Sequence, residues 1–353
     1  MVEEAEGRLE TTWHMPAEGD PHERTWLAWP TTGYTLGDDA ESAESARRTW
    51  AAVANAVAAF EPVTVVVDPR DRRVAPRYLD GSIELIEAPL DDAWIRDSGP
   101  TFVIGGDGRL GAVDWVFNGW GGQDWASWEH DAMLAPIVAE YAGAELVESW
   151  LTNEGGGIHV DGEGLVLLTE SVQLDPGRNP EATKPDVESE LARTIGATRA
   201  IWLPRGLTRD SERFGTRGHI DIVATMPEPG RVLLHEQLDP SHPDASVTVE
   251  ARAILEYHDL EVVSLPAPRT LRDDDGWLDW SYVNHSLVNG GVIACVFDDA
   301  GDAEALDVLR AAYPGRDVVG VDARELFVRG GGIHCITQHQ PRHRPAAAKE
   351  RNP

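Results

Sequence analysis

A run of three glycines leads directly into a cysteine near the end of the chain, in Arg329-Gly330-Gly331-Gly332-Ile333-His334-Cys335-Ile336-Thr337-Gln338. Glycine lets the backbone take positive φ and lets a ligand approach closely. A cysteine delivered by such a turn can lie at the wall of a pocket, where its thiolate would be a strong nucleophile. The alternative is an ordinary buried thiol, because free cysteine is among the most buried residue types. Cys335 is therefore a candidate nucleophile that the rest of the chain must support.

Further polar motifs carry carboxylate, imidazole and amide side chains. The candidates that could share a site with the cysteine are Asp97, Glu154, His219, Asp221 and Asn284. Carboxylates such as Asp97 and Asp221 match a planar guanidinium through bidentate, charge-assisted hydrogen bonds. His219 can serve as acid and base. The set therefore suits nucleophilic attack on a guanidinium group.

Each of these residues also has a simpler interpretation. Asp97, beside Arg96, could be a surface pair or a turn cap. His219 and Asp221 are two residues apart, so on an expected strand they point to one face. That spacing also suits a metal pair, but no third ligand motif of the usual kind is present, so we expect no metal. Glu154 could orient the site rather than bind the substrate.

Histidines, cysteines and tryptophans outside this set are expected to pack. His159 and His334 each precede a residue in an apolar strand pattern and are expected to be structural. Cys295 lies in an apolar run and is expected in the core. Most tryptophans should pack, but Trp94 and Trp120 stand near glycines and could cover a flat cation by stacking.

One unit recurs along the chain: a polar motif, a strand, a glycine turn, a strand, a helix and a short strand. The polar motifs begin near residues 94, 153, 218, 281 and 329, and residues 154–160 closely repeat the pattern of 329–335. Regular self-similarity indicates repeated units around an axis or along a line. Five such units would bring their polar motifs to one central site. The alternative is an ordinary α/β domain with coincidental glycine turns.

Hydrophobic periodicity and turn residues predict the elements that would hold these motifs. The expected strands span 63–67, 83–86, 101–104, 165–169, 200–203, 218–224, 231–234, 262–265, 292–297 and 318–321. The expected helices span 40–60, 129–142, 184–195, 246–258 and 302–312.

Composition narrows the class of partner. The 353 residues are 42% hydrophobic, enough for a sizeable core, and the formal net charge is −31. Nucleic acid is therefore a poor partner, whereas a cationic small molecule would be attracted. We expect a protein of the cytoplasm, because no secretory signal and no apolar run long enough to cross a membrane is present. The basic segment 342–353 is expected to be a disordered tail after a domain spanning 1–341.

Taken together, the motifs resemble the agmatine deiminase family, which is related to bacterial peptidylarginine deiminases within the guanidine-modifying superfamily. The segments that carry the resemblance are Met15–Glu18, Thr25–Pro30, Trp94–Pro100, Glu154–Gly164, Trp202–Gly206, Gly218–Asp221, Ser281–Asn284 and Gly330–Gln338. They cover the chain from about residue 13 to 341, and their order is highly specific.

The resemblance implies a single domain folded as a five-bladed α/β propeller, a pseudo-fivefold repeat of ββαβ units around a central active site. It implies a hydrolase that converts agmatine to N-carbamoylputrescine and ammonia, a step of putrescine biosynthesis, without a metal or organic cofactor. It also allows a homodimer. By matching positions, Cys335 would be the nucleophile, His219 the acid and base, and Asp97 and Asp221 the guanidinium ligands. The further candidate substrate-binding residues are Glu154, Trp94, Asn284, Trp120 and Arg217.

The sequence departs from the family pattern at two places. Arg217 stands where agmatine-specific members carry an acidic residue, and Gly332, preceded by Arg329, stands where they carry asparagine. An arginine near the site would repel an amine and attract a carboxylate, so free or peptide-bound arginine is an alternative substrate. Amidino transfer from the same covalent intermediate, or guanidinium binding without catalysis, are further alternatives.

Overall fold

The computed structural model describes residues 12–343 as a mixed α/β structure with five sheets. Its strands are β1 (Trp13–His14), β2 (His22–Ala28), β3 (Val63–Val67), β4 (Glu84–Glu87), β5 (Thr101–Gly105), β6 (Leu110–Val116), β7 (Glu145–Thr152), β8 (Ile158–Val160), β9 (Leu165–Thr169), β10 (Arg199–Leu203), β11 (Ala224–Glu228), β12 (Arg231–Glu236), β13 (Glu261–Pro266), β14 (Ser286–Val288), β15 (Gly291–Val296), β16 (Asp317–Asp322) and β17 (Gln338–Pro341). Its α-helices are α1 (Gly33–Leu36), α2 (Ala40–Ala58), α3 (Ile95–Ser98), α4 (Gly119–Gly122), α5 (Leu134–Ala142), α6 (Glu170–Gln173), α7 (Lys184–Ile195), α8 (Asp244–Tyr257), α9 (Asp302–Ala312) and α10 (Arg324–Phe327).

Every sheet contains the same arrangement of an antiparallel pair followed by a parallel strand. In the first sheet β5 and β6 are antiparallel, and α5 leads to β7, which is parallel to β6. The strands β8, β9 and β10 repeat this order with α7. So do β11, β12 and β13 with α8, and β14, β15 and β16 with α9. The predicted repeating unit is therefore present in four consecutive segments of the chain.

The fifth sheet joins the two ends of the described chain. Its order is β17-β2-β3-β4, with β17 antiparallel to β2 and β2 parallel to β3. Gln338 lies opposite Trp26, and the Trp26 indole N–H donates to Gln340 Oε1 at 3.0 Å. The short α1 and the long α2 lie between β2 and β3, so β17, β2, α2 and β3 follow the order of the other four units, and β4 is an additional strand at the edge.

Local sequence explains why these elements form. Every residue of β3 is buried, as expected of a strand covered on both faces. The N-terminus of α2 is capped by Asp39, whose carboxylate accepts from the Ser42 N–H at 2.8 Å. The helix packs its apolar face, including Trp50, Val53 and Val57, into the main core.

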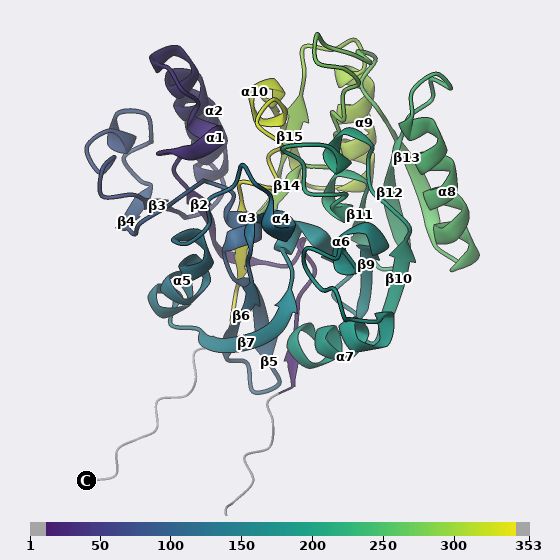
Figure 1. The fold of residues 1–353 in the computed structure, drawn as a ribbon, viewed down its shortest axis with the longest axis horizontal. Coiled ribbons are helices and arrows are strands. Elements are labelled where there is room, and N and C mark those ends of the chain that lie inside the picture. Colours follow the sequence, from purple (N-terminus) through teal and green to yellow (C-terminus); the bar gives the residue numbers. More distant parts are fainter. Residues whose placement is uncertain (1–11, 344–353) are drawn as a thin grey trace, which may run out of the picture.

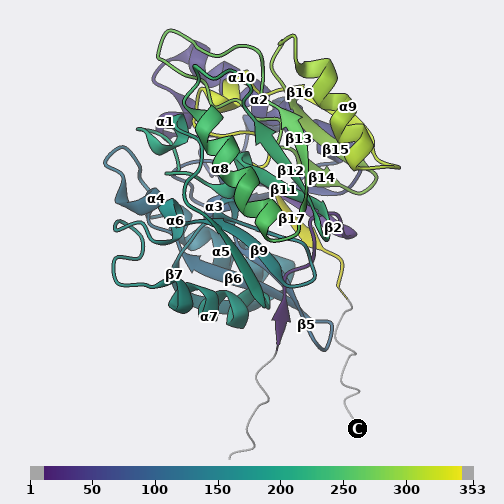
Figure 2. The ribbon, with the colours of Figure 1, turned by 90° about the vertical axis from the view of Figure 1, so that its right-hand side faces the viewer.

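The long helices lie at the outside of the molecule. Figure 1 shows α2, α5, α7, α8 and α9 around the periphery, with the short α3 near the middle. Figure 2, turned by 90°, shows α8 lying over β12 and β13. Among the described residues, none of the helices is long and apolar enough to span a bilayer.

Two sequence predictions about these elements were wrong. The segment 218–224 was expected to be a strand, but Ile220–Ile222 form a 3-10 turn, and β11 begins only at Ala224. The reason is Asp210, whose carboxylate accepts from the Gly218 and His219 N–H groups and thereby withdraws them from a ladder. His334 was expected in a strand pattern, but residues 333–336 form a turn.

The other expected elements are present with small shifts in their ends. The helix expected over 129–142 is a 3-10 turn, Asp131–Met133, followed by α5. Most of the expected tail, residues 344–353, lies outside the described residues.

Candidate active site

The five polar motifs occupy the same place in the five sheets. Each stands just before the first strand of an antiparallel pair: Asp97 in α3, Glu154 before the 3-10 turn Gly155–Gly157, Asp221 in Ile220–Ile222, Asn284 before β14 and Cys335 before β17. Because the position is equivalent in every sheet, the motifs can meet although they are far apart in sequence.

Contacts connect each motif to the next. The Gly156 N–H donates to Asp97 Oδ1 at 3.1 Å, and Glu154 Oε2 lies 3.3 Å from His219 Nε2. Asn284 Nδ2 donates to the Asp221 carbonyl at 3.3 Å and to Cys335 Sγ at the same distance. The Arg96 N–H, beside Asp97, donates to the Cys335 carbonyl at 3.2 Å and completes the set.

Cys335 lies buried among polar groups, with 4% of its surface exposed. Its Sγ is 3.5 Å from Asp221 Oδ2, and it accepts from Asn284 Nδ2. Burial raises the pKa of the Cys335 thiol well above its ordinary value, and the carboxylates of Asp221 and Asp97 raise it further. Without a cation in the site, the group is therefore a thiol at neutral pH.

The pKa values of the two carboxylates beside the thiol are shifted in opposite directions. Burial raises the pKa of Asp97 to about 6, and the nearby charges of Glu154 and Asp221 contribute to the rise. Burial also acts on Asp221, but the His334 imidazole at 2.8 Å outweighs it and holds the Asp221 pKa below its ordinary value. Asp221 Oδ1 is buried and has no hydrogen-bond partner within residues 12–343. This oxygen is free to accept from a ligand.

His219 lies between carboxylates. Burial lowers its pKa, but Asp97 and Glu154 outweigh burial and raise the pKa to about 9. Its Nδ1 is 3.8 Å from Asp97 Oδ1, too far for a hydrogen bond, and has no hydrogen-bond partner in the described chain. At neutral pH His219 is therefore an imidazolium with one N–H directed at no protein acceptor.

The glycines make room for this convergence. A Cβ on Gly156 would lie 2.5 Å from His219 Nδ1 and 2.9 Å from Asp97 Oδ1. A Cβ on Gly331 would lie 3.0 Å from Cys335 Sγ, and one on Gly332 would lie 2.3 Å from Asn284 Oδ1. In this structure a Cβ at any of these three positions would press on the groups beside it, so the absence of a side chain fits the close approach of the turns.

Glu154 lies behind His219. Its carboxylate accepts from Arg178 Nε at 2.9 and 3.0 Å on one side and faces His219 Nε2 on the other. It lines neither cavity that reaches Cys335. The geometry therefore fits the second of the two sequence interpretations, in which Glu154 orients the site.

Trp94 and Trp120 line a cavity with Asp97 and Cys335. Trp120 takes a left-handed backbone conformation, with φ of 56°, and its indole N–H donates to Asp97 Oδ2 at 2.9 Å. Trp94 donates to Thr35 Oγ1 at 3.0 Å. Both side chains therefore line this cavity, and their expected stacking on a flat cation stays a prediction.

Arg217 is not brought into this group. Its guanidinium lies 3.4 Å from Asp175, and its side chain is 44% exposed. Arg329 lines the cavity, but its nitrogens donate to the Thr35 and Ser42 carbonyls and to Glu325. Arg217 therefore faces Asp175 and lines neither cavity at Cys335, and the Arg329 guanidinium is engaged by protein oxygens.

Sequence analysis missed several residues that support the site. His334 bridges Asp221 and Glu18, with 2.8 Å from Nδ1 to Asp221 Oδ2 and 2.8 Å from Nε2 to Glu18 Oε1. Asp210 holds the turn that carries His219. Arg178 fixes Glu154. Glu18 and His334 lie in family-like segments, which was the signal that could have found them; no spacing marked Asp210 or Arg178, because their contacts are tertiary.

Two narrow cavities meet at Cys335, Thr216 and Gly330. The first is also lined by Trp94, Asp97, Trp120, Trp125, Phe214, Gly215 and Arg329. The second is also lined by Asp210, His219, Asp221, Ile222, Asp279, Phe327 and Gly331. Within residues 12–343, no group of three or more His, Cys, Asp or Glu side chains is arranged to hold a metal ion.

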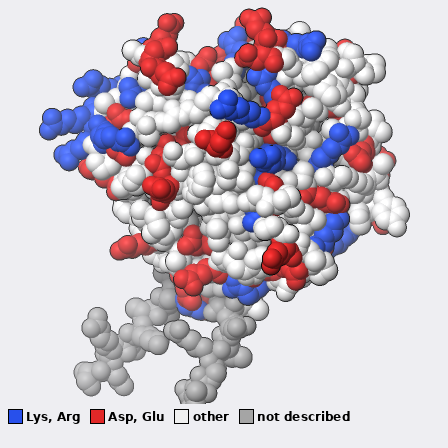
Figure 3. Space-filling view, viewed as in Figure 1, with Lys and Arg blue, Asp and Glu red and all other residues white. Residues whose placement is uncertain are grey.

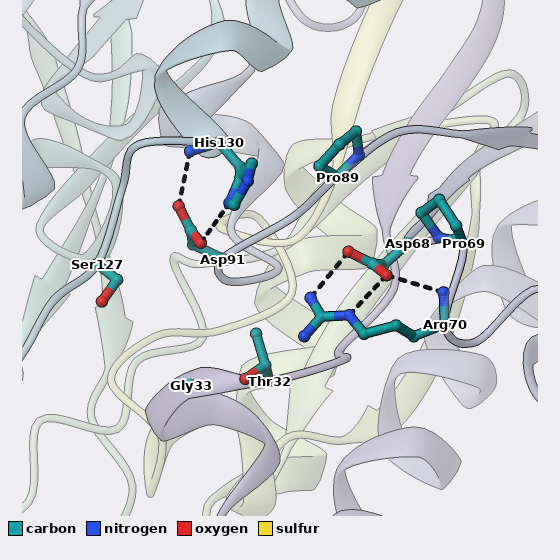
Figure 4. A pocket seen from close by; sticks show the side chains of 9 residues that line it. All are labelled: Thr32, Gly33, Asp68, Pro69, Arg70, Pro89, Asp91, Ser127 and His130. Carbon is teal, nitrogen blue, oxygen red and sulfur yellow. Dashed lines mark hydrogen bonds and ion pairs between the residues drawn. The ribbon is translucent and has the colours of Figure 1, made fainter.

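A more open cleft lies elsewhere and contains none of the candidate residues. Figure 4 shows its lining, with Arg70 paired to Asp68 and His130 paired to Asp91. The charged groups of this cleft are paired with one another, and the cleft contains no candidate nucleophile. The candidate active site is therefore at the cavities that reach Cys335.

Comparison with known proteins agrees with this geometry. Residues 14–341 match the model of a family described as Porphyromonas-type peptidyl-arginine deiminase. A Streptomyces coelicolor protein named "Putative agmatine deiminase" is 53% identical over 338 residues, covering 94% of this chain and 99% of that protein. The agmatine deiminase of Stutzerimonas stutzeri is 40% identical over 359 residues, covering 93% and 95%. The structure of Enterococcus faecalis agmatine deiminase superposes with a TM-score of 0.86 at 31% identity, covering 94% and 96%.

Proposed function

The chain belongs to the Porphyromonas-type peptidyl-arginine deiminase family, and on this basis we propose that it is a hydrolase that converts agmatine to N-carbamoylputrescine and ammonia. The observation that carries the proposal is the meeting of Cys335 with Asp97, His219 and Asp221 at a buried cavity. Two polar atoms there, His219 Nδ1 and Asp221 Oδ1, have no hydrogen-bond partner in the described chain.

Binding begins with the two carboxylates. Asp97 and Asp221 accept hydrogen bonds from the guanidinium N–H groups and hold its central carbon beside Cys335 Sγ. The bound cation offsets the negative charges that raise the thiol pKa, so Cys335 ionises on binding and releases its proton to solvent.

Chemistry then follows in two stages. The thiolate adds to the guanidinium carbon, and the His219 imidazolium protonates the departing nitrogen, so that ammonia leaves and a covalent thiouronium remains on Cys335. Neutral His219 next takes one proton from water, whose oxygen adds to the same carbon; the Cys335 thiolate is then expelled, and the remaining hydroxyl proton passes to solvent. The product carries a ureido group. Glu154, held by Arg178, keeps His219 oriented through both stages.

Replacing the nucleophile tests the reaction. Cys335→Ala should abolish ammonia release from agmatine, because the covalent step is lost, while circular dichroism shows an intact fold. Cys295→Ala, which removes the chain's other thiol from the core, is the matched control and should retain turnover. An active Cys335→Ala enzyme would refute the mechanism.

Trapping the intermediate gives an independent measurement. In wild-type enzyme quenched with acid during turnover of agmatine, mass spectrometry should find the thiouronium adduct on the peptide that contains Cys335, because His219 is present for the stage that forms it. No adduct on that cysteine, together with turnover, would contradict covalent catalysis.

The alternative of arginine or peptidyl-arginine as substrate rested on Arg217 and Arg329. Their guanidinium groups are bound to Asp175 and to the Thr35, Ser42 and Glu325 oxygens, which favours agmatine. A screen of ammonia release from agmatine, arginine, acylated agmatine and arginyl peptides decides between them. Ornithine formation from arginine and glycine would reveal amidino transfer. Binding of these compounds without turnover would indicate a guanidinium-binding protein that has no catalytic activity.

We also propose that residues 12–341 form one domain, a five-bladed propeller with pseudo-fivefold symmetry. The support is the common strand order of the five sheets and the contacts that connect each polar motif to the next. A cytoplasmic location and a homodimer are further proposals, which cell fractionation and light scattering test.

A further inference from the structure

The imidazole ring of His334 lies between two buried carboxylates, and the proposed reaction assigns it no role. Its Nδ1 is 2.8 Å from Asp221 Oδ2, and its Nε2 is 2.8 Å from Glu18 Oε1. An ionised carboxylate only accepts hydrogen bonds, so each contact requires a proton on the ring nitrogen. Both ring nitrogens therefore donate, and His334 is an imidazolium.

Glu18 and Arg96 complete a set of paired charges around this ring. Glu18 Oε1 accepts from Arg96 Nη1 at 3.3 Å, and Arg96 Nε donates to the His334 carbonyl at 3.3 Å. Two carboxylates thus face two cations, and the side chains of His334, Glu18 and Asp221 are at most 8% exposed. Buried charges of this kind are stable only when each is paired and hydrogen-bonded. Removal of the imidazolium would leave Asp221 without a hydrogen-bonded cation.

Other histidines near the set do not replace His334. Burial lowers the pKa of three of them, namely His159, His285 and His339. His159 Nε2 accepts from a backbone N–H at 2.8 Å, which is possible only for a ring nitrogen without a proton. The His219 imidazolium contacts Glu154. Within residues 12–343, His334 is therefore the one cation in hydrogen-bond contact with Asp221.

The contact with His334 determines which oxygen of Asp221 remains for a ligand. Oδ2 is taken by the imidazolium, whereas Oδ1 is buried and has no hydrogen-bond partner in the described chain. A bond at one oxygen restricts rotation of the carboxylate, so the other oxygen has a defined direction. His334 is in turn held by Glu18, whose carbonyl lies 2.9 Å from His22 Nε2.

We propose that His334, held by Glu18, is a positioning residue that directs Asp221 Oδ1 towards the guanidinium group of the substrate and supplies the positive charge that keeps this carboxylate ionised. The inference rests on the proposed function, because it concerns the guanidinium end of the same substrate. His334 lines neither cavity at Cys335, so it acts through Asp221 and not on the reacting atoms.

Two amide variants separate the two contacts of the ring. In His334→Asn the amide nitrogen takes the place of Nδ1 and donates to Asp221, whereas in His334→Gln it takes the place of Nε2 and contacts only Glu18. Both variants lose the charge. We expect kcat/KM for agmatine to fall by about tenfold in His334→Asn and by about a hundredfold or more in His334→Gln, because only the second loses the donor to Asp221. The loss should be the same for 1-butylguanidine, which has the same chain without the ammonium, because Asp221 meets the guanidinium end.

The pH dependence of kcat/KM distinguishes this role from a purely structural one. Without the imidazolium, burial raises the pKa of Asp221, and the protonated carboxyl does not bind a cation. The acid limb should therefore move to higher pH in both variants, and the loss relative to wild type should shrink as the pH rises. His242→Asn is the control, because this buried ring bonds to the Leu278 carbonyl and the Asp244 N–H. It should keep the wild-type kcat/KM and acid limb.

Three results would overturn the proposal: wild-type kcat/KM in folded His334→Gln, a smaller loss in His334→Gln than in His334→Asn, or a loss that is the same at every pH. If neither variant folds, nitrogen NMR of the histidine-labelled wild type decides, since two N–H protons on the His334 ring at neutral pH support the proposal and one overturns it. A wild type that hydrolyses neither compound would instead refute the proposed function, and this result is separate from the ratios between variants.

Discussion

At the scale of single residues, the site is defined by charge states that the neighbours impose. Asp221 is kept ionised by His334, whereas Asp97 is not fully ionised until the pH exceeds about 6, because burial and two nearby carboxylates oppose its charge. Burial also opposes the charge of His219, but the carboxylates of Asp97 and Glu154 favour it and raise the His219 pKa to about 9. The Asp97 and Asp221 carboxylates, a protonated imidazole and a thiol thus coexist at neutral pH, and this arrangement favours a cation as its ligand.

These shifts predict a bell-shaped pH dependence of kcat/KM, whose rising limb also reflects the Cys335 proton that is released to solvent on binding. Below about pH 6 Asp97 is protonated and cannot hold the guanidinium, so kcat/KM should fall with falling pH. Above about pH 9 His219 is neutral and cannot protonate the leaving nitrogen, so kcat/KM should fall again. Ammonia release measured across this range, with circular dichroism at both extremes to verify folding, checks the profile. An acid limb near the ordinary pKa of an exposed aspartate would contradict the assignment of Asp97.

At the scale of elements, the turn before each antiparallel pair is the functional part of the repeat. The 3-10 turns and glycine runs end regular structure early, so that side chains such as His219 and Cys335 lie at the cavity instead of in a strand. The turn that carries Cys335 contacts the turn that carries Asn284 so closely that Gly332 has no room for a side chain.

Gly332→Asn tests this close approach. The new Cβ would meet Asn284 Oδ1 at 2.3 Å and the Phe327 ring at 2.8 Å, so the two turns must separate. We expect unfolding free energy to fall by about 1–3 kcal/mol. We expect kcat/KM to fall about a hundredfold, because Asn284 and the thiol lose their alignment. Gly81→Asn, where a Cβ meets nothing within 4 Å, is the control for the substitution itself. Full activity in Gly332→Asn, with unchanged thermal stability, would show that the turns can adjust.

At the scale of the whole molecule, two features depend on the complete chain. The first is the fifth sheet, in which β17 from the C-terminal part pairs with β2 from the N-terminal part and holds Cys335 just before it. The second is the formal net charge of −31. Figure 3 shows acidic and basic side chains mixed over one face, so attraction of a cation arises from the overall excess of acid and not from a single acidic patch on that face.

This excess charge predicts a salt effect on substrate capture. Because salt screens exposed charges, kcat/KM for the doubly charged agmatine should fall by about several-fold between about 0.01 M and about 0.3 M sodium chloride. The singly charged 1-butylguanidine should show a weaker dependence. Initial rates at low substrate concentration measure both slopes, and kcat at saturation should stay constant. A salt-independent kcat/KM for agmatine would mean that the local site alone attracts the substrate.

The sequence alone predicted most of the regular helices and strands and the residues proposed to carry the chemistry. Helices such as α2 and α7 and strands such as β3 follow from local patterns of apolar residues, caps and turns, and they appear close to their expected ranges. The similarity of residues 154–160 to residues 329–335 indicated that the polar motifs are equivalent. Asp97, His219 and Asp221 were predicted on this basis to lie beside Cys335, and the structure brings these side chains together. Residue type and repeated spacing carry this information because equivalent positions in repeated units occupy equivalent places in space.

Only the tertiary structure decided how those groups are supported and which residues face the substrate. Asp210, Arg178 and Glu18 act through contacts with residues that are distant or irregularly spaced in the chain, and such contacts leave no periodic signal. The glycine run and Cys335 are thus determined by local sequence, whereas the charge states around the thiol and the groups that bring a guanidinium to it depend on burial and proximity, which exist only in the folded chain.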